Sequence, residues 1–192
     1  QAIANLSEVN CVILSDYGQG VIYDQGVERI TKHAKENNIP IIADPKLTGL
    51  HRTHDVDWII FQSRGFELMK RRIGESDDRL AAESLIKSYG WKHLVVLAGE
   101  NGVTIYSKEQ ETVHAPCTLS ELRQIIGLID AAVVAIAVSI SSSFDVSDTA
   151  LLTNAACECI LGAEATDSFS LSREELIHRV GEIAWNLQVS KR

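Results

Sequence analysis

The sequence of 192 residues has no excess of positive charge: 18 Lys and Arg stand against 26 Asp and Glu, a formal net charge of -8. Nucleic acids and anionic membranes attract basic surfaces, so this balance argues against either as the main partner. The longest apolar run, Ala131 to Ile140, is too short to span a bilayer. The first residues also lack the basic and apolar blocks of a signal peptide. We therefore expect a cytoplasmic protein that binds neither nucleic acid nor membrane.

Patterns for disulfides and metal sites are missing as well. The cysteines are scattered, and the one close pair, Cys157 and Cys159, falls in a helical pattern that points the two thiols about 200° apart. The histidines have no ligand spacing, since His51 and His54 lie in a polar loop. The sequence predicts free thiols and no metal centre.

The chain does contain a regular alternation of strand and helix patterns. Short apolar runs predict strands at Cys11–Ser15, Ile39–Asp44, Val56–Phe61 and His93–Gly99, followed by a hairpin with Lys108–Gln110 in its turn. Amphipathic or apolar stretches predict helices at Asp24–Asn37, Asp77–Ser88, Ile129–Ser142, Asp148–Leu161 and Arg173–Leu187, the last two with Ser147 and Ser172 as N-caps. The alternation predicts an α/β fold with a largely parallel sheet, and we expect one domain over residues 1–192.

Polar and glycine-rich segments follow the predicted strands. In parallel sheets, ligands bind beyond the carboxyl ends of the strands, so these segments are candidates for a site. Each segment also has an ordinary explanation as a turn or a helix cap. Four such segments at one edge of a sheet nevertheless favour a ligand site: Asp16–Gly20, Asp44–Lys46, Gly99–Gly102 and Gly127–Asp130.

Five motifs resemble a known family when they are taken in order: VILSDYGQGVI, IIADPK, VVLAGENGVTIY, GLIDAAVVAIAVSI and TNAACECILG. From about Cys11 to about Thr166 the chain is similar to the carboxyl-terminal two thirds of ribokinase-like (PfkB) sugar kinases. It is most similar to the heptose 7-phosphate kinase domain of bifunctional ADP-heptose synthases, mainly at Ser15–Gly20 and Asp44–Lys46. The resemblance implies a three-layer, Rossmann-like sheet with flanking helices, and we expect the N-terminal strands and the lid to be absent.

The resemblance also implies an activity, which is phosphoryl transfer from ATP, with Mg²⁺, to a hydroxyl of a sugar phosphate. Asp130 matches the base that accepts the proton of the attacking hydroxyl. The other implied sites are the anion hole at Gly127, Leu128 and Ile129, the nucleotide site at Gly99, Glu100, Gly102 and Asn154, and the substrate site at Asp16 and Lys46.

Several motif positions depart from the family pattern. Ile129 replaces a glycine, and a β-branched residue disfavours the positive φ angles that let the backbone approach a phosphate. Gly65 lacks the carboxylate that the family uses near magnesium, so we expect weaker neutralisation of the phosphate charges. Together the changes predict impaired catalysis. The remaining departures are Gln19, Gln62, Leu97, Ala98, Gln124 and Ile126.

Three hypotheses about function remain open. The chain is an impaired sugar kinase, or a non-catalytic pseudokinase that acts as a partner or regulatory subunit, or a folded remnant. In the simplest alternative, Ala131–Ile140 is a core helix and Asp130 is a carboxylate that interacts with its dipole. We also expect an apolar sheet edge that a protein partner or self-association would cover.

Overall fold

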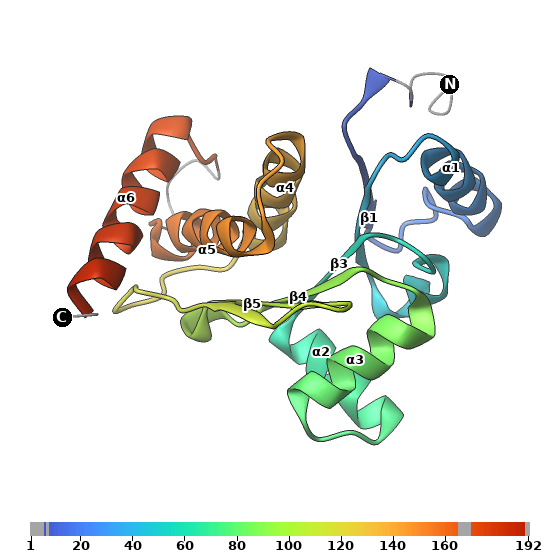
Figure 1. Cartoon of the computed structure of the whole chain (residues 1–192), viewed down its shortest axis with the longest axis horizontal. Coiled ribbons are helices and arrows are strands. Elements are labelled where there is room, and N and C mark those ends of the chain that lie inside the picture. The colour runs from blue at the N-terminus through green and yellow to red at the C-terminus, as the bar shows by residue number, and fades with distance from the viewer. Residues whose placement is uncertain (1–5, 7, 165–169, 191–192) are drawn as a thin grey trace. The chain divides into compact units, whose positions relative to one another are not determined.

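The computed structural model describes residues 6, 8–164 and 170–190, and its strands form one sheet in the order β1-β2-β3-β4-β5-β6 (Figure 1). β1 pairs in parallel with β2, and β2 pairs in parallel with β3. The strands are β1 (Val12–Asp16), β2 (Ile41–Pro45), β3 (Trp58–Gln62), β4 (His93–Leu97), β5 (Val103–Ser107) and β6 (Val113–Ala115). All six predicted strands are present, and the predicted turn at Lys108–Gln110 lies between β5 and β6.

Contacts within the chain divide it into two compact units. The first comprises Gln1–Val96 with Ile105–Thr112, and the second comprises Leu97–Thr104 with Val113–Arg192. The prediction of a single domain over residues 1–192 stays a prediction.

The core of the first unit is built on strands that are apolar on both faces. Ile41, Ile59 and Leu94 are almost fully buried, as expected of strands that are covered on both sides. Trp91 is fully buried too, and its Nε1 donates to the carbonyl of Thr53 at 2.7 Å. The helices of this unit are α1 (Asp24–Glu36), the 3₁₀ helix η2 (Leu47–Arg52), α2 (Ser63–Ile73) and α3 (Asp78–Tyr89).

The sequence prediction missed helix α2. Its signal is present, because Phe66 and Met69 are one turn apart and both are buried. Three basic residues in the last turn complement the helix dipole, and Gly74 ends the helix with a left-handed φ of 73°. Gly65, a poor helix former in the first turn, hides this pattern in the sequence.

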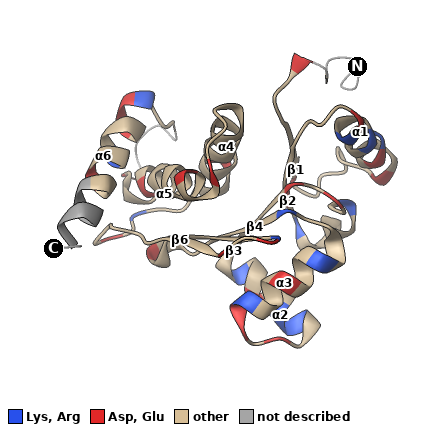
Figure 2. Ribbon diagram, viewed as in Figure 1, with Lys and Arg blue, Asp and Glu red and all other residues tan. Residues whose placement is uncertain are grey.

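The second unit is mainly helical. In Figure 2 the ribbon is coloured at charged residues on many of the helices, whereas α4 contains one acidic residue, Asp130. The prediction of Ser147 as an N-cap is wrong: the carboxylate of Asp145 accepts the amide of Asp148 at 2.8 Å, and α5 begins one residue before Ser147. The helices of this unit are η3 (Gly99–Asn101), α4 (Leu128–Ser141), α5 (Val146–Gly162) and α6 (Arg173–Ser190).

The N-cap predicted at Ser172 is confirmed. The amide of Glu175 donates to Ser172 Oγ at 3.2 Å, while the amide of Ser172 donates to a carboxylate oxygen of Glu175 at 2.8 Å. This reciprocal pair is a capping box, which satisfies two amides at the start of α6. Among the helices that the structure describes, none has both the length and the apolar character needed to cross a membrane.

His93 is a buried titratable group at the start of β4. Its ring stacks on Trp58 at a centroid distance of 4.0 Å, and its Nδ1 lies 2.8 Å from Ser107 Oγ. Burial lowers the pKa of His93 to about 4, although the nearby Asp57 carboxylate acts in the opposite direction. The folded chain therefore holds a neutral imidazole at pH values where an unfolded chain, with a His93 pKa of 6.5, becomes protonated.

We expect the folded chain to lose stability as the pH falls from 6.5 towards 4, because His93 then binds a proton in the unfolded chain and stays neutral in the folded chain. Between pH 7 and pH 5, His93 contributes about 2 kcal/mol to this loss. Urea denaturation of the unchanged chain and of His93→Gln at both pH values measures the difference. An equal loss in the two proteins would show that His93 titrates normally in the fold.

Candidate functional site

The turn before α4 has the geometry of an anion site. Gly127 is the residue before the helix and is left-handed, with φ 85° and ψ 1°. Apart from its two chain neighbours, no residue has a heavy atom within 4 Å of the position that a Cβ on Gly127 would occupy, so the space beside this backbone is open. The first amides of a helix have no partner within it and carry the positive end of the helix dipole. An anion could therefore approach the start of α4.

The conformational conflict expected at Ile129 does not occur. In this turn Gly127 alone has a positive φ, and α4 already begins at Leu128, so Ile129 has an ordinary helical backbone. Leu128 is buried and Ile129 is half-buried. Having isoleucine rather than glycine at position 129 therefore adds side-chain bulk beside the start of the helix and does not strain the backbone.

Asp130 lies in the first turn of α4 and is exposed. With Gly127 it lines a cavity of about 660 Å³. The rest of the lining is mostly apolar and comes from α4, α5 and the start of α6, including Val134, Leu152 and Leu176. This position suits a base that faces a ligand, and it equally suits a carboxylate that stabilises the helix start.

The predicted nucleotide glycines form a tight turn between β4 and β5. The amide of Ala98 donates to the carbonyl of Gly102 at 2.8 Å, and the amide of Gly102 donates to the carbonyl of Gly99 at 3.0 Å. A Cβ on Gly102 would collide with the backbone of Ala115 to Cys117, so this glycine is required by packing. Glu100 is exposed in the same turn. A Cβ on Gly99 would lie 3.7 Å from Leu122 Cδ1, so the turn lies beside the segment that leads to α4.

Asn154, the fourth predicted nucleotide residue, lies inside the protein. It is 1% exposed, and its Nδ2 donates to the carbonyl of Pro116 at 3.0 Å and to Glu158 Oε1 at 2.9 Å. Among the described residues, its buried Oδ1 has no hydrogen-bond partner. As it lies here, Asn154 holds the segment after β6 against α5.

Sequence reasoning did not identify Glu158 or Arg179. The Glu158 carboxylate is fully buried and accepts hydrogen bonds from the amide and hydroxyl of Thr118, from Asn154 and from Arg179. Arg179 also pairs with Glu182 at 2.8 Å, and its hydrogen bonds to Glu182 and Glu158 hold its pKa raised against the opposing effect of burial. The spacing of Asn154 and Glu158, one helical turn apart on α5, is the one signal in the sequence.

Asp16, predicted to bind substrate, lies at the carboxyl end of β1 and is buried. Its two carboxylate oxygens accept from the amide of Gly18 at 2.8 Å and from Arg52 Nη1 at 2.9 Å. A Cβ on Gly49 would collide with this carboxylate, so η2 also packs closely on Asp16. Arg52, which the sequence analysis did not single out, also pairs with Asp24 at 2.6 Å.

Lys46, the second predicted substrate residue, follows β2 and is exposed. Its Nζ lies 5.7 Å from the centroid of the Tyr17 ring, and a Cβ on Gly18 would lie 3.9 Å from its Cγ. The structure therefore brings Lys46 and Asp16 together at the ends of β1 and β2. Unlike the Asp16 carboxylate, the Lys46 ammonium is available to a negatively charged ligand from solvent.

Gln62 and Gly65, the two positions at which the sequence predicts a weakened magnesium site, lie at the junction of β3 and α2. Gln62 is exposed at the end of β3, and Gly65 lies in the first turn of α2 against Phe61. Within the described residues, no three His, Cys, Asp or Glu side chains are grouped closely enough to hold a metal ion.

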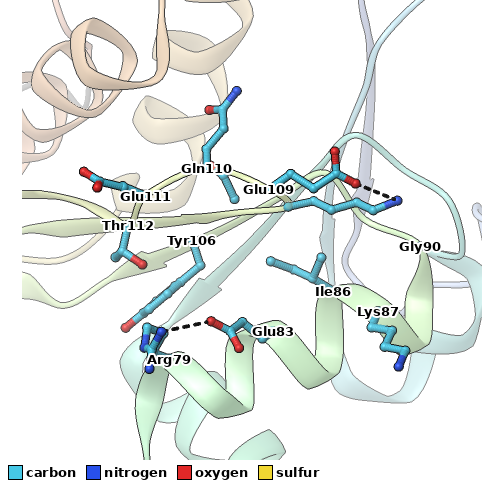
Figure 3. Close-up of a pocket in the computed structure, with 12 residues that line it drawn as sticks. Arg79, Glu83, Ile86, Lys87, Gly90, Tyr106, Glu109, Gln110, Glu111 and Thr112 are labelled. Atoms are coloured by element: carbon cyan, nitrogen blue, oxygen red, sulfur yellow. Dashed lines mark hydrogen bonds and ion pairs between the residues drawn. The ribbon is translucent and has the colours of Figure 1, made fainter.

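A separate cavity of about 920 Å³ lies in the first unit, between α3 and the β5–β6 connection (Figure 3). Tyr106 and Ile86 line it together with charged side chains such as Arg79 and Glu83, which form an ion pair at 3.5 Å. None of the predicted site residues lines this cavity. The predicted site residues lie outside this cavity, Asp16 and Lys46 in the first unit and the others in the second.

The fold is ribokinase-like. The chain matches the ribokinase of Thermotoga maritima with a TM-score of 0.76 and 22% identity, over 94% of this chain and 60% of that chain. It matches the structure of Arabidopsis thaliana ribokinase complexed with ribose and ATP with a TM-score of 0.78 and 14% identity, over 93% of this chain and 58% of that chain. The predicted α/β fold class is confirmed.

Among curated proteins, the chain is similar to the bifunctional protein HldE. It is 27% identical to HldE of Aliivibrio fischeri over 90% of this chain, and 29% identical to HldE of Photobacterium profundum over 86% of this chain. The chain spans 36% and 35% of the length of these two relatives. No model of a known protein family matches the chain. The predicted resemblance is thus confirmed, in fold by the two ribokinases and in sequence by HldE.

We expect Gly102→Ala to lower the free energy of unfolding by about 3 kcal/mol or more, because a Cβ there meets the backbone after β6 and φ is 80°. Gly181→Ala in α6 is the matched control, since nothing lies within 4 Å of its Cβ position and alanine favours a helix. Urea denaturation measures both. If Gly102→Ala were as stable as the control, the inference that backbone packs closely against Gly102 would be wrong.

Proposed function

We propose that this chain is a sugar kinase-like protein related to heptose 7-phosphate kinases, with impaired transfer of a phosphoryl group from ATP to a sugar hydroxyl. One observation carries the proposal. Gly127 is left-handed with open space beside it, and Asp130 lies in the first turn of α4, so a phosphate could bind next to a carboxylate base. The chain that carries this arrangement is similar to HldE over 90% of its length.

The proposed chemistry follows from these groups. The carboxylate of Asp130 accepts the proton of a sugar hydroxyl while that oxygen attacks the terminal phosphorus of ATP, and the bond from this phosphorus to the bridging oxygen of ADP breaks. The first amides of α4 face the negative charge on the transferring group. Gly127 leaves the backbone accessible to that group, whereas Ile129 adds bulk beside it, which would slow the step.

The start of α4 fits the phosphates of ATP better than the described residues fit a resident Mg²⁺. Mg²⁺ commonly binds through substrate phosphates and one or two carboxylates, so it would arrive with the nucleotide. When bound, Mg²⁺ would neutralise charge on the phosphates. Without a carboxylate at Gly65, fewer protein oxygens would fix its position.

The sugar phosphate would bind at the ends of β1 and β2. Lys46 is exposed beside Gly18 and supplies a cation for the phosphate of the substrate. Asp16 would act by fixing this loop, since both of its oxygens already accept hydrogen bonds.

A second candidate is a pseudokinase that acts as a partner or regulatory subunit. The buried position of Asn154 favours it, because the amide nitrogen of that side chain already donates to Pro116 and Glu158 inside the protein. A non-catalytic subunit would keep the fold and the interactions that hold it while losing turnover.

Isothermal titration calorimetry with ATP and Mg²⁺ tests the proposal. We expect the unchanged chain to bind ATP in the micromolar to millimolar range, and Asp130→Asn to bind it at least as tightly, because a negative charge beside the phosphates is removed. Any transfer to a heptose phosphate should fall by at least about 100-fold in Asp130→Asn.

Asp148→Asn is the matched control, since Asp148 is another exposed acid in the first turn of a helix, α5. It should leave both ATP binding and transfer unchanged. Binding without transfer by the unchanged chain would favour the pseudokinase. No binding of ATP at millimolar concentration would exclude the kinase function for this chain.

A further inference from the structure

The side chain of Gln124 joins the segment before α4 to the end of α5. Its Nε2 donates to the carbonyl of Ile160 at 2.8 Å, and its Oε1 accepts the amide of Ile126 at 3.0 Å. The side chain is half-buried and thus partly shielded from competing water. It connects the last turn of α5 to the residue directly before Gly127.

Backbone contacts reinforce the same connection. The amides of Arg123 and Gln124 donate to the carbonyl of Leu161 at 2.8 Å and 3.4 Å, and the Arg123 side chain pairs with Glu164. The last carbonyls of a helix have no partner within it, so Ile160 and Leu161 are natural acceptors. These contacts fix the path of residues 123–126 on the end of α5.

Gln124 differs from the backbone contacts in what it holds. The backbone hydrogen bonds from this segment to Leu161 of α5 end at Gln124. The Gln124 side chain reaches two residues further and accepts the amide of Ile126. The turn then closes through Leu128, whose amide donates to the carbonyl of Ile125 at 3.3 Å. Gly127, in the left-handed conformation, lies between these two hydrogen bonds.

We propose that Gln124 is a positioning residue, which holds the Ile125–Gly127 turn against α5 so that the first amides of α4 are presented to phosphate. The inference rests on the proposed function. Gln124 touches no ligand itself, and it acts through the turn. A change at Gln124 therefore affects ligands that carry phosphate and leaves the rest of a nucleotide's binding intact.

Gln124→Met tests this inference, because methionine has a similar length, cannot donate to Ile160, and offers only a weakly accepting sulfur to the amide of Ile126. We expect hydrogen exchange at the Ile126 amide, followed by NMR, to become about fivefold faster, and the dissociation constant for ATP to rise by about fivefold. The dissociation constant for adenosine should not change, because adenosine carries no phosphate. A general loss of structure would weaken the binding of ATP and of adenosine alike.

Gln110→Met is the matched control, since Gln110 is exposed in the β5–β6 connection. It should change neither exchange at Ile126 nor affinity for ATP. Thermal unfolding verifies that each variant is folded at the temperature of the measurements.

The results separate this inference from the proposed function. If the unchanged chain binds no ATP, the proposed function is wrong, and exchange at Ile126 still decides whether Gln124 holds the turn. If the unchanged chain binds ATP and folded Gln124→Met has unchanged exchange and affinity, the inference about Gln124 is overturned. Equal weakening of ATP and adenosine would also overturn it.

Discussion

Parallel pairing of β1, β2 and β3 is the constraint on which the arrangement of Asp16 and Lys46 in the first unit depends. In a parallel sheet the carboxyl ends of neighbouring strands lie at one edge, and the register pairs Asp16 with Pro45. That register puts Lys46 beside the Asp16 loop, although the two residues are far apart in the sequence. Arg52 then closes the arrangement by pairing with Asp16.

The second unit depends on a different interaction, the buried carboxylate of Glu158. Burying a charge is costly unless hydrogen bonds and an ion pair compensate, and Thr118, Asn154 and Arg179 supply them. These partners come from the segment after β6, from α5 and from α6. The carboxylate therefore fixes three elements at once, and its removal would leave Arg179 partly buried beside Thr118.

The glycines of the motifs fall into two kinds. Gly102 is required by packing, because backbone lies where its Cβ would be, whereas open space surrounds the Cβ position of Gly127. Both have positive φ, so conformation alone does not separate them. The difference is what lies beside the backbone, and open space next to a helix start is what an incoming phosphate needs. A glycine motif in a sequence does not reveal which kind is present.

The sequence by itself determined the α/β class, the six strands and most of the helices, since apolar periodicity and caps such as Ser172 act over a few residues. The motifs also indicated where polar groups gather. The sequence could not show that Asn154 donates to Glu158 inside the protein, or that Arg52 pairs with the Asp16 carboxylate. Nor could it show that the Gln124 side chain joins Ile126 to Ile160. Those contacts join residues that packing brings together. The geometry of such hydrogen bonds leaves no local pattern in the sequence, so only the tertiary structure fixes it.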